Sequence, residues 1–167
     1  MSILITGITG FLGSRIAQAC ANRGVFEVVG LAHSEIRGKD FTYTVPGVKT
    51  YSVDISQDHD MIDHIIKKHS VEYIIHTAAM KHIGICEDNA NKAIDVNIFG
   101  SQRIAKAAIR NGVKNIIAIS TDKSINPTCV YGSTKFLMEK LVLELGFSVF
   151  QGVNFFFSTG SVLDLWD

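Results

Sequence analysis

The sequence lacks the features that would point to several common classes of protein. It carries no net charge, because 16 basic residues balance 16 acidic ones, so no electrostatic field draws it to nucleic acid or to an anionic membrane. Its three cysteines are odd in number and lack the spacing of metal ligands, which indicates reduced, buried thiols. No apolar run is long enough to cross a bilayer, and the opening MSILITG meets a glycine too early for a signal peptide. We therefore expect a cytoplasmic protein without a metal, a membrane or a nucleic acid as partner.

What the sequence does contain is an alternation of strand-like runs and helical patterns, in a chain of 167 residues with 47% hydrophobic content. This alternation is typical of a parallel sheet with helices on both faces. The expected strands are residues 2–6, 26–32, 48–54, 72–78, 115–120 and a segment within 147–157. The expected helices are residues 11–24, 59–69, 91–111 and 131–145, and residues 33–47, which lack a helical period, should form an irregular connection. We predict one α/β domain, a doubly wound parallel sheet with the Rossmann fold, over residues 1–167.

A glycine-rich loop, TGITGFLG, joins the first expected strand to the first expected helix. Its glycines have the spacing G-x-x-G-x-x-G, and a turn without Cβ atoms lets backbone N–H groups approach a pyrophosphate at the helix N-terminus. Because the loop lies between a strand and a helix, it predicts a dinucleotide site rather than a merely structural turn. The residues expected to contact this cofactor are Gly7, Thr9, Gly10, Phe11, Leu12, Gly13, Ser34, Arg37, Asp54, Ile55, Ala78, Ala79, Lys81, Tyr131 and Lys135.

The identity of the dinucleotide depends on the end of the second expected strand. A carboxylate there would bind the ribose 2′-hydroxyl of NAD, whereas an arginine would bind the 2′-phosphate of NADP. The sequence offers Ser34, Glu35 and Arg37 together. Glu35 lies slightly beyond the usual position, so we favour NADP over NAD. Asp54 either contacts the adenine or serves as a carboxylate near a helix N-cap.

A tyrosine and a lysine are four residues apart in the last expected helix, and this spacing places Tyr131 and Lys135 on one face. An adjacent ammonium should lower the pKa of the phenol and make Tyr131 a general base. A Y-x-x-x-K motif downstream of a dinucleotide loop resembles the short-chain dehydrogenase/reductase superfamily.

Two longer segments narrow this resemblance. AAMKHIGICEDNANKAIDVNIFGSQRIAKAA and ISTDKSINPTCVYGSTK are similar to the inverting UDP-N-acetylglucosamine 4,6-dehydratases of the polysaccharide biosynthesis family, which carry A-A-x-K-H, S-T-D-K, N-P and Y-G-x-(S/T)-K. The matches extend from residue 3 to about residue 145. The pairing of S-T-D-K with Y-G-x-x-K is the specific part.

The resemblance implies a reaction in three stages. Tyr131 takes the proton of the sugar 4-hydroxyl as hydride leaves carbon 4 for the nicotinamide, and Thr121 hydrogen-bonds the 4-oxygen. Lys123 then removes the proton at carbon 5 while Asp122 protonates the departing 6-hydroxyl. Hydride returns to carbon 6 and carbon 5 is protonated from the opposite face, so the cofactor is regenerated and stays bound.

Chemistry and position in the sheet also indicate roles for the residues around this motif, independently of the resemblance. Elimination needs an acid and a base beside one substrate, and ligands of a parallel sheet bind beyond the carboxyl ends of its strands, so we favour a catalytic role for Asp122 and Lys123 over a solvated ion pair. Lys81 and His82 contact substrate or nicotinamide, or belong to a plain loop. Other expectations are a packing role for Cys86 and Cys129, an organising role for Asn97, small residues beside the cofactor ribose at Ala78 and Ala79, and solvent exposure for His64 and His69.

Members of this family are about twice as long, and their second half supplies most of the sugar-nucleotide pocket. The final segment, QGVNFFFSTGSVLDLWD, is similar to the family's R-Y-G-N-V-x-G-S-R-G-S-V-I-P-L-F, but Gln151 replaces one of its arginines. We therefore expect the substrate domain to be largely absent. The sequence leaves open whether the chain is an active enzyme. Three functions stay open: a UDP-sugar 4,6-dehydratase, a UDP-sugar 4-epimerase, and a non-catalytic dinucleotide-binding protein. We also expect a homo-oligomer that pairs through helices 91–111 and 131–145, with the aromatic run at 155–157 either buried by the partner or folded back over the crevice.

Overall fold

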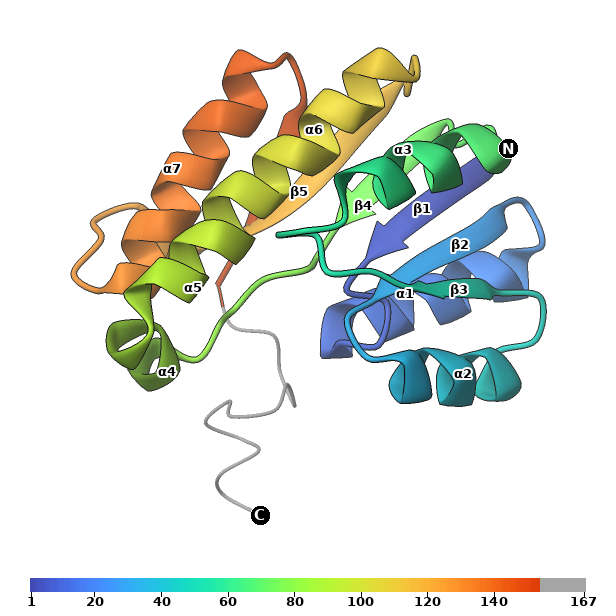
Figure 1. Ribbon diagram of the computed structural model, residues 1–167, viewed down its shortest axis with the longest axis horizontal. Coiled ribbons are helices and arrows are strands. Elements are labelled where there is room, and N and C mark those ends of the chain that lie inside the picture. Colours follow the sequence, from blue (N-terminus) through green and yellow to red (C-terminus); the bar gives the residue numbers. More distant parts are fainter. Residues whose placement is uncertain (154–167) are drawn as a thin grey trace.

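The chain folds around a six-stranded sheet in which all neighbouring strands are parallel (Figure 1). The computed structural model describes residues 1–153. The strands are β1 Ser2–Thr6, β2 Glu27–Ala32, β3 Lys49–Ser52, β4 Tyr73–His76, β5 Asn115–Thr121 and β6 Ser148–Gly152, in the order β3-β2-β1-β4-β5-β6. The predicted α/β Rossmann fold is confirmed, and the order reverses between β1 and β4, where such sheets bind ligands.

Helical segments connect the strands. They are α1 Phe11–Arg23, α2 Glu35–Thr44, α3 His59–Lys68, α4 Ile83–Asp88, α5 Ala90–Ile94, the π-helical turn η1 Asp95–Gly100, α6 Ser101–Arg110, the short 3-10 turn η2 Asp122–Ser124 and α7 Val130–Glu144. The helix expected at 91–111 is thus one helical run interrupted by a π turn. A π turn adds a residue to the turn and often lies at a functional site.

The irregular connection expected at 33–47 is wrong, because this segment contains α2. The Ser34 hydroxyl caps the helix by accepting from the Arg37 amide, and Glu35 pairs with Lys39 one turn later. Only Gly38 is fully buried, where the helix passes close to Thr50. A helix that buries so little has no apolar stripe, which explains why its period was not visible in the sequence.

The two faces of the sheet carry different helices. Helices α3, α6 and α7 cover one face, and α1 and α2 lie on the other (Figure 1). The first face is lined by a core that includes Leu4, Ile74 and Ile116. On the second face, Ile117 of β5 and Phe150 of β6 remain 41% and 53% exposed. Among residues 1–153, helices therefore cover both faces of the sheet only on the side of β1 to β3, and one face of β5 and β6 stays open.

His69 is an exception to the expected exposure of the α3 histidines. His64 is exposed, as predicted, but His69 is buried at the end of α3. Its ring lies 2.7 Å from the Tyr51 hydroxyl and 3.2 Å from the Glu27 carboxylate. The prediction failed because these partners come from β2 and β3, which are distant in sequence.

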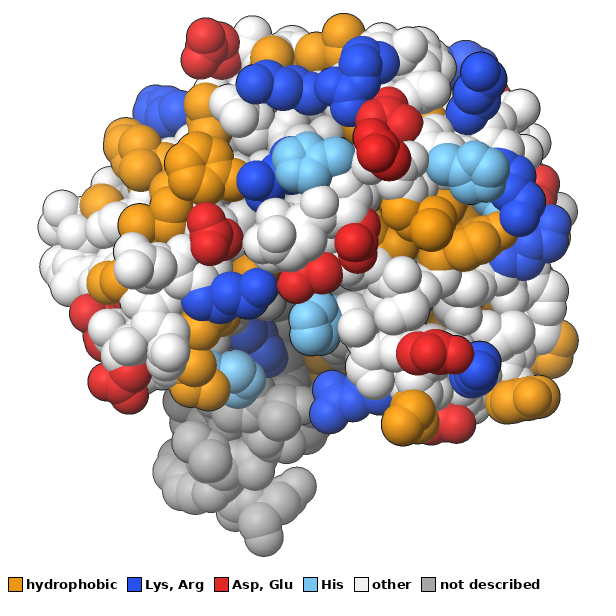
Figure 2. All heavy atoms as spheres, viewed as in Figure 1, with side chains coloured by type: hydrophobic (Ala, Val, Ile, Leu, Met, Phe, Trp, Pro, Cys, Tyr) orange, Lys and Arg blue, Asp and Glu red, His pale blue; other side chains and the backbone are white. Residues whose placement is uncertain are grey.

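The sequence has no net charge and no long apolar run, and both features can be followed in the structure. On the face drawn in Figure 2, basic and acidic side chains are interspersed. No helix among residues 1–153 has the length and apolar character needed to cross a membrane. The cysteines are unpaired, with Cys86 buried and Cys20 and Cys129 partly buried.

Candidate active site

A pocket of about 770 Å³ lies beyond the carboxyl ends of the strands. It extends from the glycine loop at one end to the segment after β5 and the start of α7 at the other. Of the expected site residues it is lined by Gly7, Thr9, Gly10, Phe11, Leu12, Asp54, Ile55, Ala78, Ala79, Lys81, Thr121, Lys123, Tyr131 and Lys135. A volume of this size suits an extended small molecule, and the position is the one that open parallel sheets use for ligands.

The glycine loop is shaped by close backbone approach. Gly7 has a φ of 66°, and a Cβ there would lie 2.9 Å from the Ala78 backbone. A Cβ on Gly13 would lie 2.3 Å from the Gly7 carbonyl oxygen, so this glycine allows α1 to pack against the turn. Gly10 begins α1 without a side-chain cap, and the first turn of α1 contains no acidic residue. The amides at this helix end are therefore available to an anion.

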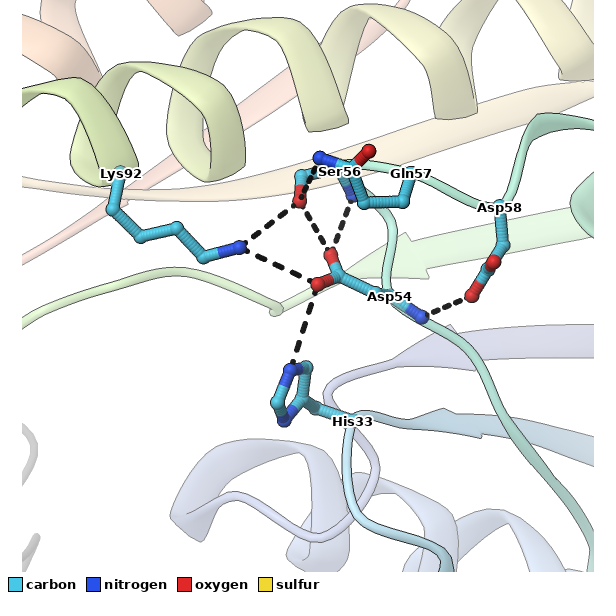
Figure 3. Close-up of polar contacts among 6 residues, drawn as sticks. All are labelled: His33, Asp54, Ser56, Gln57, Asp58 and Lys92. Carbon is cyan, nitrogen blue, oxygen red and sulfur yellow. Dashed lines mark hydrogen bonds and ion pairs between the residues drawn. The ribbon is translucent and has the colours of Figure 1, made fainter.

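A polar cluster forms the pocket wall near the end of β3 (Figure 3). The Asp54 carboxylate accepts hydrogen bonds from the Ser56 amide and hydroxyl and from Lys92 of α5. His33, directly after β2, points toward the same carboxylate, with its Nε2 3.6 Å from Asp54 Oδ2. Burial works to raise the pKa of Asp54, but the Ser56 and Lys92 contacts outweigh it and lower the pKa. The cluster holds an ionised carboxylate whose charge is already partly neutralised.

A buried histidine, His76, connects the end of β1, just before the glycine loop, to the start of α6, just after the π turn. Ser101 donates to the Asn97 carbonyl oxygen at 2.7 Å, so its single proton is used and its oxygen must accept from His76 Nε2 at 2.8 Å. Burial and, to a smaller extent, the nearby Lys135 charge together lower the pKa of His76 to about 3, so the ring is neutral. Nδ1 then accepts from Thr6 at 2.7 Å, and Thr6 in turn accepts from the Ala78 amide. The tautomer of His76 is thereby fixed by its neighbours.

Asn97 acts as the expected organiser of the site. It is fully buried in η1, and its amide both accepts from the Met80 amide at 2.8 Å and donates to the Met80 carbonyl at 3.0 Å. A further bond of 3.0 Å reaches Thr134, whose hydroxyl donates to the Tyr131 carbonyl. The loop after β4 and the start of α7 are therefore fixed to the π turn.

Tyr131 and Lys135 do line the pocket together, but their electrostatics differ from the expectation. Lys135 is buried and donates to the Ile119 carbonyl oxygen at 2.6 Å. Burial lowers the pKa of Lys135 to about 8, against an opposing effect of Glu139. Burial raises the pKa of the Tyr131 phenol, and a hydrogen bond with Thr121 acts in the other direction. The expected lowering of the Tyr131 pKa by Lys135 is therefore wrong for this arrangement, because burial of the phenol is the largest influence and raises the pKa.

The end of β5 and the turn that follows it bring three polar groups together. The Thr121 hydroxyl donates to Asp122 Oδ1 at 2.9 Å, and Lys123 Nζ lies 3.4 Å from the same oxygen. The Thr121 hydrogen bond lowers the pKa of Asp122, and the Lys123 charge adds to this effect. Thr121 and Lys123 line the pocket, whereas Asp122 reaches it only through these two neighbours.

Four expected site residues do not line the pocket: Gly13, Ser34, Arg37 and Asp122. Gly13 serves helix packing and Ser34 caps α2. Sequence reasoning missed His33 and Lys92, which the pocket brings beside Asp54. His33 was detectable as the residue that directly follows a strand, whereas Lys92 comes from a distant helix and left no local signal.

The chain matches the polysaccharide biosynthesis protein family over residues 3–167. It belongs to this family. A UDP-N-acetylglucosamine 4,6-dehydratase (inverting) from Campylobacter jejuni is 34% identical over 143 residues, which cover 84% of this chain and 42% of that protein. A UDP-glucose 4-epimerase from Rickettsia canadensis is 31% identical over 99% of this chain and 52% of its own length. The chain thus spans about half the length of the curated relatives it matches.

Solved structures share the fold. The structure of Pen from Bacillus thuringiensis has a TM-score of 0.92 and 29% identity, and the match covers 99% of this chain and 54% of that one. A UDP-glucose 4-epimerase from Brucella ovis, crystallised with NAD, has a TM-score of 0.79 and 21% identity over 91% of this chain and 51% of its own. At that identity the second likeness concerns the fold alone.

Proposed function

We propose that this chain is part of a nucleotide-sugar 4,6-dehydratase that acts on UDP-N-acetylglucosamine-like substrates with a bound nicotinamide dinucleotide. The observation that supports it most is the Asp122–Lys123 pair, with 3.4 Å between its charged groups; Lys123 lines the pocket together with Tyr131. Oxidation at carbon 4 needs one base, whereas elimination of water needs a second base and an acid. An epimerase needs only the first of these groups.

The residues fit a dinucleotide. The turn between Gly7 and Gly10 exposes backbone amides at the start of α1, and no acidic side chain in the first turn opposes a pyrophosphate. Ala78 and Ala79 line the middle of the pocket with small side chains. When bound there, the dinucleotide supplies a reversible hydride acceptor. The Lys135 ammonium, with one bond already made to Ile119, has further N–H groups with which to bind a ribose hydroxyl.

Each polar group has a defined part in this proposal. Tyr131 accepts the proton of the sugar 4-hydroxyl, which requires that its phenol is first ionised against the effect of burial, and Thr121 hydrogen-bonds the 4-oxygen. Lys123 removes the proton at carbon 5, and Asp122 gives a proton to the departing 6-hydroxyl. Asp122 must be protonated to act as this acid, whereas its contacts with Thr121 and Lys123 lower its pKa and favour the ionised form. The proposal therefore requires that Lys123 passes a proton to Asp122 once substrate is bound, which leaves Lys123 neutral as the base and Asp122 protonated as the acid.

Within the nicotinamide dinucleotides we favour NADP. The Glu35 carboxylate, which would suit the 2′-hydroxyl of NAD, is paired with Lys39 at 2.6 Å. The residue that directly follows β2 is His33 and not a carboxylate. Both features favour a 2′-phosphate over a hydroxyl.

The 31% identity to a Rickettsia 4-epimerase supports epimerisation as a second candidate. Assembly into a homo-oligomer and a cytoplasmic location stay predictions. Exposed apolar side chains on the helical run 90–110 and on α7, such as Phe99 and Leu137, are consistent with pairing through these helices. The aromatic run at 155–157 lies outside the described residues.

The activities can be separated by their products. Purified protein would be incubated with UDP-N-acetylglucosamine and NADP or NAD, and the products analysed by mass spectrometry. We expect a product lighter by one water, a 4-keto-6-deoxy sugar nucleotide, which Tyr131→Phe abolishes. A product of unchanged mass with an inverted carbon 4 would favour epimerisation, and unchanged substrate would favour the non-catalytic alternative.

A further inference from the structure

Glu139, one turn after Lys135 on α7, is a meeting point of three chain segments. Its Oε1 accepts from the Ser120 hydroxyl at the end of β5 through a very short hydrogen bond. The same oxygen lies 2.5 Å from the Ser124 hydroxyl in η2 and 3.2 Å from the Gln151 side-chain amide of β6. A single carboxylate oxygen therefore joins α7 to two strands and to the turn that follows β5.

The two serines flank the polar segment of the site. Ser120 precedes Thr121 and Ser124 follows Lys123, and both serines are almost fully buried. The Ser124 hydroxyl also lies 2.6 Å from the Thr121 carbonyl oxygen, so it can give its one proton to either acceptor. Gln151 donates to Ser124 at 2.8 Å and closes the network. The segment 121–123 is thus held at both ends by groups that contact Glu139.

We propose that Glu139 is a positioning residue that holds the segment 121–123 against α7. The inference rests on the proposed function, since that is what gives Thr121, Asp122 and Lys123 their roles. Tyr131 and Lys135 are on the same helix as Glu139. The carboxylate therefore sets the distance between the groups proposed for oxidation and those proposed for elimination, without itself contacting the substrate.

The charge of Glu139 has a second effect, on Lys135. The two side chains are four residues apart on one helix face, and the carboxylate raises the pKa of the buried ammonium against the effect of burial. Gln151 of β6, which also donates to Glu139, is uncharged and so does not neutralise the carboxylate. Glu139 accordingly has two separable properties: an oxygen that accepts hydrogen bonds and a negative charge.

Two substitutions separate these properties. Glu139→Ala removes both, whereas Glu139→Gln keeps an acceptor oxygen of the same reach and removes the charge. Amide hydrogen exchange of the protein would be followed at Lys123, whose amide donates to the Thr121 hydroxyl, and at Ile125, whose amide donates to the Asp122 carbonyl. We expect roughly tenfold faster exchange at these amides in Glu139→Ala and a change within about threefold in Glu139→Gln. The matched control is Glu144→Ala, an exposed glutamate on the same helix.

The outcomes distinguish positioning from general stabilisation. The Thr77 amide, bonded to Thr6 on the far side of the site, should keep its exchange rate in every variant. The titration of Lys135, followed by NMR, should move to lower pH in both Glu139 variants but not in Glu144→Ala. Faster exchange at all amides alike, or an unchanged rate at Lys123 in Glu139→Ala, would overturn the proposal. These readouts need no turnover. If wild type fails to convert a sugar nucleotide while local exchange responds as expected, then the proposed function fails and the positioning role stands.

Discussion

The Lys135 ammonium donates a hydrogen bond of 2.6 Å to the Ile119 carbonyl oxygen at the end of β5. This contact ties the helix of the Y-x-x-x-K motif to the strand that leads into Thr121. It also keeps the amine in a buried position, where the charged form is disfavoured. Lys135 therefore titrates in a range where a change of pH changes the charge of the pocket.

The first prediction concerns that titration. Lys135 should lose its proton at a pH of about 8, below its ordinary value of 10.5, because it is buried. NMR of the lysine ε-carbons, with Lys135→Arg to assign the signal, checks this. Lys39 provides the contrast, since its exposed ion pair with Glu35 raises its pKa. A Lys135 signal that titrates together with Lys39 would contradict the burial seen here.

Acid should weaken the fold through His76. Its pKa falls from 6.5 to about 3 in the folded state, so between these values the unfolded chain binds more protons. The contribution is complete above pH 6.5 and is lost as the pH falls toward 3. At pH 4.5 this loss should be roughly 2 to 3 kcal/mol relative to pH 7.

The measurement is urea unfolding of wild type and His76→Gln at both values of pH. The variant is less stable at pH 7, because it disrupts the bonds to Thr6 and Ser101, but it should lose less stability on acidification. His64→Gln, at an exposed position on the neighbouring α3, controls for removal of a histidine. Equal acid sensitivity of wild type and His76→Gln would show that His76 is not the group responsible.

Glycine substitutions should have unequal effects. Gly13→Ala places a Cβ 2.3 Å from the Gly7 carbonyl, so α1 must move, and we expect a loss of about 2 to 4 kcal/mol. Gly84→Ala has open space and an ordinary φ, so it should be neutral within about 0.5 kcal/mol. Thermal unfolding of the two variants tests the packing role of Gly13, and equal stabilities would exclude it.

If turnover is detected, the polar groups should separate into two stages. Lys123→Ala should spare oxidation at carbon 4 but stop elimination, so that reduced cofactor accumulates by its absorbance. Tyr131→Phe should prevent that absorbance from appearing. Both losses should exceed about a hundredfold in rate, as for removal of a general acid or base. Elimination of water by Lys123→Ala at the wild-type rate would remove this residue from the mechanism.

Several features of the fold were readable from the sequence, because they depend on local pattern. The glycine loop, the strand that precedes it and the Tyr131–Lys135 spacing each have a short-range signature, and the structure places them around one pocket. What escaped depends on distant contacts. Helix α2 buries only one glycine, His69 is buried by Tyr51 and Glu27, and the pKa of Tyr131 is governed by burial that no spacing reveals. Glu139 likewise gains its importance from Gln151 and the two serines, not from its own motif.

The roles proposed for Tyr131, Lys135 and Lys123 all require a dinucleotide in the pocket, so the most direct measurement is a calorimetric titration of the chain with NADP and NAD. We predict saturable binding with one site per chain, tighter for NADP than for NAD. Gly10→Val should abolish binding of both dinucleotides while the protein stays folded, because a branched side chain blocks the amides at the start of α1. Wild-type protein that is folded yet shows no binding of either dinucleotide at millimolar concentration would contradict the proposed site.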